Sequence, residues 1–386
     1  MGNARKAPSY ALFHGCFSCK TAVTLATRRS LPTAALTLAT SLVAIPCAAQ
    51  DPSALALVGT RAIDVRDFGE ALEAFTKAAT MRRDDASICF GAGVAAFMIG
   101  QDDEARSRFE CALTLKPSFL PAAMWLADLH YRAGRLAEAI AVYETARRHS
   151  RSSNSLQPQL DAWRKEHALQ STFQELRTEH FIALFARAAE RAHARAILNR
   201  LEAAYLTIGN TLGLYPGRPI IVVLYTREQY AEITGLAEWS SAAYDGRIRV
   251  ALGGAMQQPE ELDRVLSHEL VHAIVAAAGG RSVPEWLNEG LATLLEPVSR
   301  DDLDAALERS GAAIELSQLH DSFARFSTRS DAEIAYGLSV RAVRRLIEKR
   351  GMAALVDLLK DLGRGVPFAR AFEQRIGMRY EDFANF

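Results

Sequence analysis

Small, acidic and aromatic side chains recur every 34 residues along the first part of the chain. A Glu-Ala pair begins at Glu70, Glu104 and Glu138, and an aromatic residue follows four positions after each Ala. The other residues in phase are the aromatics Phe75, Phe109 and Tyr143, the alanines Ala78, Ala112 and Ala146, and the small residues Gly59, Gly93 and Ala127. This period predicts stacked helix pairs, because small residues let antiparallel helices touch while the aromatic fills the gap to the next pair.

The pattern over residues 54–150 resembles the tetratricopeptide repeat, with three unrelated helical hairpins as the alternative. The early Trp of that repeat is missing, and only the second unit ends in a proline, Pro117. The resemblance implies three helix pairs whose concave side suits a protein partner. Residues 148–154 are Ser-rich and predict a loop, and 156–169 predict a final helix. We therefore place a capping and linker segment at 151–170.

Beyond this linker the pattern changes to mixed α and β. Apolar, β-branched runs at 180–185 and 219–225 predict strands, with a long helix over 188–212 between them. Apolar and polar side chains alternate over 247–252, which predicts a half-buried strand at the edge of a sheet. From Pro259 onward nearly everything is helical in pattern, so the expected fold class is α+β.

A well-bounded helix is predicted over 259–279. Pro259 with acids in the first turn marks its start, and the glycine pair 279–280 marks its end. The sequence His-Glu-Leu-Val-His occupies 268–272 within it. Two His four residues apart lie on one helix face, about one turn apart, where they can bind the same zinc ion. Glu269 points about 100° away around the helix, toward a water on the metal rather than the metal itself.

A catalytic zinc site needs a third protein ligand, because zinc prefers four ligands and keeps one position for water. A second helix is predicted just downstream, where Ser282 and Glu285 form a capping box around Pro284. Glu289 on this helix supplies the third ligand. Gly290 costs about 1 kcal/mol relative to Ala in a helix interior, which we explain by close approach of the metal-binding helix. The candidate ligands are therefore His268, His272 and Glu289.

The HELVH motif, followed 17 residues after its second His by the Glu of WLNEGLA, resembles the gluzincin clan of zinc metallopeptidases. The likeness is greatest to the thermolysin-like peptidase MA domains of exported bacterial proteins. It covers about 179–386, including AYGLSVRAVRRLIEKRG from Ala335, inside a domain that we place at 171–386. The resemblance implies Zn²⁺ on the two His and Glu289, with Glu269 as general base. The exopeptidase motif of the large aminopeptidases has no counterpart in this sequence.

Tyr336 is the candidate stabiliser of the transition state. Peptide hydrolysis develops negative charge on the carbonyl oxygen, which a Tyr hydroxyl on the opposite wall would stabilise. In the resembling enzymes a Tyr on a later helix does this, and Tyr336 stands in a comparable place. A packing aromatic is the alternative, with Tyr244 as a second candidate. Of the other carboxylates on the second helix, Glu285 is assigned to capping and Glu296 lies two turns beyond Glu289.

Residues 1–49 are predicted to be an export signal. Arg28-Arg29 precede an uncharged run at 31–45, no acid precedes Asp51, and small residues allow cleavage after Ala49. A helix of this run rises about 22 Å against about 30 Å of hydrocarbon core, so we expect no membrane span after cleavage. The alternatives are an organellar transit peptide, a start codon assigned too early and lipid attachment at Cys47. We expect an exported protein, periplasmic or secreted.

Cleavage changes both the charge and the cysteine content. The chain has 45 Lys plus Arg and 45 Asp plus Glu, and removal of five leader cations leaves 40 against 45, a net charge of −5. This charge argues against a nucleic-acid binder that neutralises phosphates. Only Cys89 and Cys111 remain. They can form a disulfide in an oxidising compartment, although the favoured interpretation is that they are two small residues that pack between helices.

Two functional hypotheses follow. The first is an exported zinc peptidase that hydrolyses peptide bonds by a metal-activated water, with Glu269 as general base. In it, the strand at 247–252 pairs with an extended peptide substrate, and the repeats dock substrate or a protein partner. The second is a repeat-based interaction scaffold with an inactive or structural metal domain. The intact Glu269 favours the first, since an inactive site has no need of its base.

Overall fold

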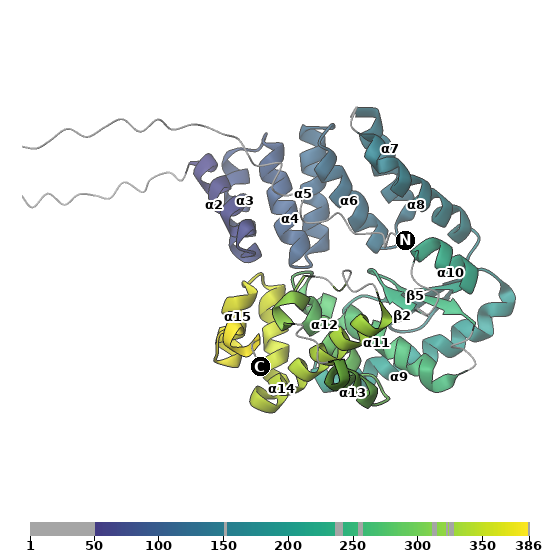
Figure 1. The fold of residues 1–386 in the computed structure, drawn as a ribbon. Coiled ribbons are helices and arrows are strands. Elements are labelled where there is room, and N and C mark those ends of the chain that lie inside the picture. Colours follow the sequence, from purple (N-terminus) through teal and green to yellow (C-terminus); the bar gives the residue numbers. More distant parts are fainter. Residues whose placement is uncertain are drawn as a thin grey trace, which may run out of the picture.

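The computed structural model describes residues 51–149, 153–235, 242–253, 258–310, 315–321, 323 and 328–384. The predicted export signal, with its cleavage after Ala49, lies outside the described residues. A layer of paired helices lies over a second unit made of a small sheet and further helices (Figure 1). None of the described helices combines the length and the apolar content that crossing a bilayer requires.

Three helix pairs form the repeats. They are α2 (Pro52–Asp64) with α3 (Phe68–Met81), α4 (Ala86–Met98) with α5 (Asp102–Leu115), and α6 (Leu120–Arg132) with α7 (Leu136–His149). The small residues in phase lie against the aromatics, as the period predicts. A Cβ added at Gly59 would lie 2.7 Å from the Phe75 ring, and one at Gly93 would lie 2.6 Å from the Phe109 ring.

The predicted final helix is present. After a short 3-10 turn at Ser153–Leu156, α8 (Gln157–Gln170) places Leu160 and Trp163 against the last pair, where the Trp163 ring lies 4.7 Å from the ring of Tyr143. This helix therefore buries the apolar face that the third repeat would otherwise expose.

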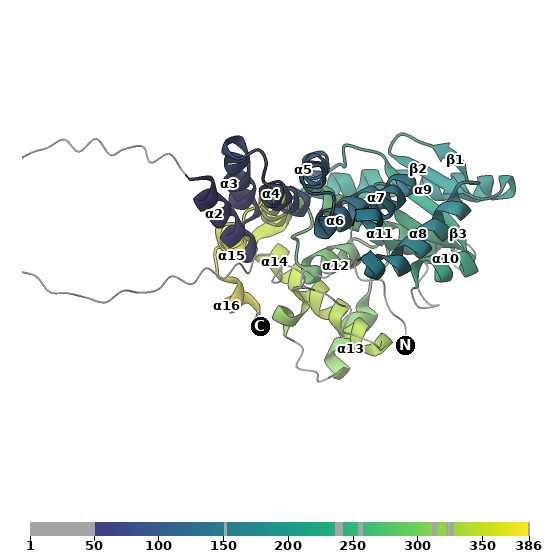
Figure 2. The same cartoon turned by 90° about the horizontal axis from the view of Figure 1, so that it is seen from above.

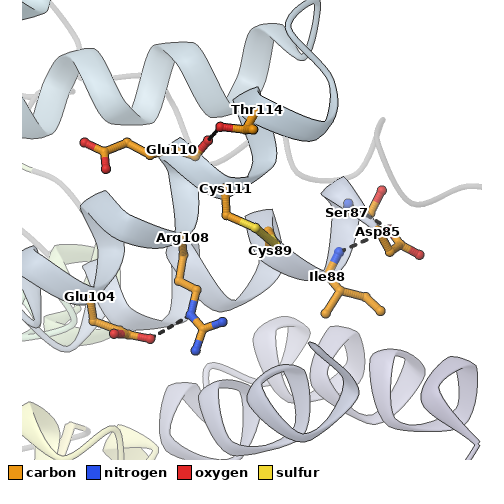
Figure 3. The surroundings of a disulfide bond; sticks show 9 residues. All are labelled: Asp85, Ser87, Ile88, Cys89, Glu104, Arg108, Glu110, Cys111 and Thr114. Carbon is orange, nitrogen blue, oxygen red and sulfur yellow. Dashed lines mark hydrogen bonds and ion pairs between the residues drawn. A yellow bond between two sulfur atoms is a disulfide. The ribbon is translucent and has the colours of Figure 1, made fainter. Parts of the chain in front are cut away.

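A disulfide joins Cys89 of α4 to Cys111 of α5, inside the second repeat (Figure 3). The favoured interpretation of these cysteines as unpaired packing residues is therefore wrong, and the pairing alternative holds. The bond spans 22 residues of chain. Closing such a loop restricts the unfolded chain, which typically stabilises a fold by about 2–4 kcal/mol.

The second unit contains a five-stranded sheet of order β1-β2-β3-β5-β4. Its strands are β1 (Gln174–Arg177), β2 (Phe181–Phe185), β3 (Ile220–Thr226), β4 (Ala242–Tyr244) and β5 (Ile248–Leu252). The three central strands are parallel and the outer two are antiparallel to their neighbours. A 3-10 turn at Ala188–Glu190 leads into α9 (Arg191–Leu212), which packs on one face of the sheet, and α10 (Arg227–Thr234) packs on the other.

The expectation that 247–252 forms an edge strand is wrong, because β5 lies between β3 and β4. The polar face of the segment 247–252 is also buried: Arg247 is 0% and Arg249 is 2% exposed. The repeats cover this face, and α8 lies beside α10 in both views (Figures 1 and 2). From the sequence, Arg247 and Arg249 look exposed to solvent. The acid that balances their charge is Glu166 of α8, which is far away in sequence.

Glu166 is the centre of a buried polar cluster, which we call the junction network: Tyr131, Glu166, Tyr225, Arg247 and Arg249. Glu166 Oε1 lies 2.7 Å from Arg249 Nη1 and 3.3 Å from Arg247 Nη2. Its other oxygen accepts a hydrogen bond of 2.9 Å from the Tyr131 hydroxyl, and Tyr225 donates to Oε1 at 3.1 Å. The network connects α6 of the repeats and the capping helix α8 to β3 and β5 of the sheet.

The turns inside the repeats also contact the second unit. Each turn has a residue with positive φ at the 34-residue spacing, namely Arg66 (60°), Gly100 (79°) and Gly134 (75°). Arg66 pairs with Asp321, Gly100 lies against Gly280, and a Cβ at Gly134 would come within 2.8 Å of Ile221. The repeats therefore use one rim, the ends of their helix pairs, to contact the second unit (Figure 1).

The remaining helices carry and surround the predicted metal-binding residues. They are α11 (Pro259–Gly279), α12 (Glu285–Leu294), α13 (Asp301–Ser310), α14 (Arg329–Gly363), α15 (Phe368–Ile376) and α16 (Tyr380–Ala384), with a 3-10 turn at Leu316–Leu319. Gly351 interrupts α14 with a non-helical φ of 80°. Trp286 of α12 is fully buried and stacks on Tyr380.

Candidate metal centre

The helix that carries the HELVH motif has the predicted bounds. It starts at Pro259 and ends at Gly279, and Gly280 adopts the positive φ of 68° that glycine tolerates best. Its motif is held within the fold, since Glu269 and His272 are buried.

The second helix begins differently from the prediction. Its N-cap residue is Pro284, with φ of −57° and ψ of 140°, and no side chain caps its first turn. The predicted capping box is therefore wrong, because Pro284 extends the chain and leaves Ser282 two residues before the cap. The carboxylate of Glu285 is consequently not used for capping, a point that matters below.

Gly290 was expected to allow close approach of the metal-binding helix, and this expectation is wrong. A Cβ at this position would lie 2.5 Å from the carbonyl oxygen of Ser339 and 2.7 Å from Val343, both on α14. The close approach at this glycine is therefore by α14 and not by the metal-binding helix.

The structure brings the three predicted ligands together. One donor atom from each of His268, His272 and Glu289 lies within 4.8 Å of the others. Glu289 Oε2 is 3.3 Å from His268 Nε2 and 3.6 Å from His272 Nε2. Two imidazole nitrogens and one carboxylate oxygen thus face a common point, although their binding of zinc stays a prediction.

The other nitrogen of each imidazole is held by a polar partner. His268 Nδ1 lies 2.9 Å from Glu296 Oε1, and His272 Nδ1 lies 3.0 Å from Asn288 Oδ1. These contacts favour the Nδ1–H tautomers and leave both Nε2 atoms as donors toward a metal. Sequence reasoning considered Glu296 only as a rival ligand and missed Asn288. The position of Asn288 directly before Glu289 was the available signal.

We expect Glu296→Gln to weaken zinc binding by about 10- to 100-fold, because the amide is a poorer acceptor for the His268 N–H. Competition with a chromophoric zinc chelator would measure the change. Asp302→Asn is the matched control, since Asp302 pairs with Arg300 at the surface nearby. Equal affinities of the Glu296→Gln variant and the wild type would show that Glu296 does not orient the imidazole.

The buried carboxylates and imidazoles of the site shift one another's pKa values. Burial by itself lowers the pKa of His268, but the carboxylates of Glu289 and Glu296 raise this pKa to about 10. Burial acts against the ionisation of Glu289, yet the two neighbouring imidazoles hold its pKa below the usual value. Burial raises the pKa of Glu269, which the two imidazoles only partly offset. The site therefore holds negative charge beside its nitrogen donors, as a cation site requires.

A pocket of about 290 Å³ opens beside these residues, and we call it the metal pocket. His268, Glu269, Thr293 and Tyr336 line it. The Tyr336 ring lies 6.2 Å from that of His268, so the first candidate for transition-state stabilisation faces the site. The second candidate, Tyr244, does not line this pocket.

Comparison with protein families agrees with both resemblances. Residues 203–384 match the Peptidase MA superfamily, and 59–118 and 103–157 match tetratricopeptide repeat families. The chain therefore has a Peptidase MA superfamily domain preceded by tetratricopeptide repeats, which confirms the predicted fold class. Domains of this superfamily are typically metal-dependent peptidases. A comparison with curated proteins gave no match.

Proposed function

We propose that this chain is an exported zinc-dependent peptidase, whose repeats dock the substrate or a protein partner. One observation carries the proposal: His268, His272 and Glu289 converge from two helices around one point, beside a pocket that also contains Glu269. The superfamily match supports a peptide or protein as substrate, and the repeat matches support a protein-binding role.

The donors fit zinc. Glu289 Oε2 is buried, contacts both imidazoles and has no hydrogen bond of acceptable geometry within the described part of the chain. Such an orphaned oxygen is costly unless a cation compensates it. Two imidazoles and one carboxylate form a donor set that catalytic zinc uses, and Zn²⁺ bound there supplies a Lewis acid that acidifies water.

The protein's own groups would handle the proton and the developing charge. Glu269 takes a proton from the attacking water and passes it to the nitrogen of the leaving amine. Its raised pKa suits both steps, since a carboxylate with pKa closer to neutrality accepts and returns a proton readily. The charge of Glu289 and burial hold the pKa of Tyr336 well above its usual value, so its hydroxyl stays protonated. It can then donate a hydrogen bond to the carbonyl oxygen.

Tyr336→Phe should lower kcat by about 10²- to 10³-fold, the usual cost of losing one oxyanion donor. KM should change little, because the hydrogen bond strengthens only as negative charge develops. Tyr244→Phe is the control and should keep a kcat close to that of the wild type. A Tyr336→Phe enzyme with normal kcat would assign this residue to packing alone.

Export is proposed on two features. An uncharged run follows Arg28-Arg29 in the leader, and the Cys89–Cys111 disulfide is of a kind that persists in oxidising compartments. Both features are compatible with a periplasmic or secreted protein.

The function is tested by incubating purified protein with casein. We expect cleavage in the presence of zinc, its loss on treatment with a chelator and its return on adding zinc. Failure to cleave casein or a mixed peptide library, with the protein folded and zinc-loaded, would instead support the interaction scaffold. Capture of a partner through residues 54–150 would then be the remaining activity.

A further inference from the structure

A second hollow, the junction cavity, lies between the repeats and the start of α12 and encloses about 400 Å³. Its repeat side is mostly apolar and includes Val94, Met98 and Trp125, and its other side includes Glu285 and Asp321. No local pattern predicts this cavity, because its two walls come from residues distant in the chain, such as Val94 and Glu285.

Helix α12 connects this cavity to the metal centre. Glu285, Glu289 and Thr293 are spaced by four residues and so lie along one helix face. Glu285 lines the junction cavity, Glu289 points to the two imidazoles, and Thr293 lines the metal pocket. The metal centre therefore lies between the two hollows. The eight-residue interval rises about 12 Å, which an extended peptide covers with about four residues.

The acidic side chains that line the junction cavity outnumber the arginines. Arg281 is bound to Asp102 by contacts of 2.7 and 3.1 Å, and its guanidinium lies over the Phe97 ring. Arg66, the other cation of the wall, pairs with Asp321. Within the described part of the chain, no ion pair or hydrogen bond satisfies the Glu285 carboxylate. Burial and then the charge of Glu289 raise the pKa of Glu285, as expected for a carboxylate without a compensating cation.

We infer that the junction cavity is a substrate subsite that binds a lysine or arginine side chain of the peptide, a few residues from the bond that is cleaved. The cationic head would pair with Glu285, and the aliphatic stem would lie along Met98 and Trp125. The repeats would thus help to select the substrate in addition to holding it. This inference rests on the proposed peptidase function and adds a substrate preference to it.

Binding of a set of peptides tests the subsite. Fluorescein-labelled decapeptides of alanine and serine, with one lysine walked through the positions, are compared with the same peptides carrying norleucine. The receptor is the full chain with Glu269→Gln, incubated with zinc, and fluorescence anisotropy reports affinity. We expect at least one lysine peptide to bind about tenfold more tightly than its norleucine counterpart. Glutamate at that position should bind more weakly than norleucine.

Adding Glu285→Gln should abolish the lysine preference. Asp84→Asn, a charge change at the exposed turn between α3 and α4, at the opposite end of α4 from Met98, should preserve it. The inference is overturned if no lysine peptide is preferred, or if the preference persists with Glu285→Gln. Both outcomes are separate from the casein test. A protein that cleaves casein without preferring lysine has the proposed function but not this subsite. A protein that binds lysine peptides but cleaves nothing has the subsite but not the activity.

Discussion

Glu269→Gln should reduce peptide hydrolysis by about 10²- to 10⁴-fold and leave zinc bound. The amide has the same shape as the carboxylate but cannot accept the proton of the attacking water. Glu269 is buried beside the ligands and lines the metal pocket, whereas the three donor atoms that converge belong to other residues. Loss of Glu269 therefore removes the base without removing the metal. Initial rates on casein and zinc content of the same preparations would measure both effects.

Glu260→Gln is the matched control for this experiment. Glu260 lies on the first turn of the same helix and is exposed. Its substitution should leave the rate close to that of the wild type. Full activity of the Glu269→Gln variant would reject Glu269 as the general base, and loss of zinc from it would mean that this side chain contributes to binding the metal.

Glu166→Gln should destabilise the protein by about 3–5 kcal/mol, the typical cost of removing one partner from a buried ion pair. Glu166 is fully buried, and Arg249 of β5 and Arg247 just before it both direct a guanidinium nitrogen at its Oε1. Without the charge, Asp245, which pairs with Arg249 at 2.9 Å, would be the only acid in an ion pair with them within the described part of the chain. The free energy of unfolding, from urea denaturation followed by tryptophan fluorescence, would show the loss. Trp163 stacks on Tyr131 of this network, so one of the four tryptophans reports on it directly.

Glu144→Gln is the control for that measurement. Glu144 of α7 forms an ion pair of 2.7 Å with Arg164 of α8, the helix that also carries Glu166, but both side chains are about 40% exposed. Exposed pairs contribute about 0–1 kcal/mol, so this change should be nearly neutral. Equal losses in the free energy of unfolding for the two variants would show that the buried ion pairs of the junction network stabilise the protein no more than an exposed pair.

The helices and the metal-binding motif were predictable because their signals are local. The 34-residue period depends on contacts within each helix pair, such as Gly59 against Phe75, and the bounds of α11 depend on Pro259 and the glycines that follow it. The spacing of the two His on one helix turn places their donors together whatever the rest of the fold does.

The errors concern contacts between segments that are distant in sequence. Arg247 and Arg249 look solvent-facing until Glu166 of the capping helix α8 is placed over them. Gly290 was linked to the wrong helix, because its neighbour Ser339 lies almost 50 residues further on. Local rules also failed at Glu285, where a capping box was expected but Pro284 begins the helix. No local pattern reports which distant surface will cover a residue.

Zinc content of the purified protein is the most direct measurement, taken by inductively coupled plasma mass spectrometry on the wild type and on His268→Ala after dialysis against trace zinc. We expect about one zinc per chain in the wild type and almost none in the variant, because only two donors remain. Equal zinc in both proteins, or none in a folded wild type, would contradict a metal centre built from His268, His272 and Glu289.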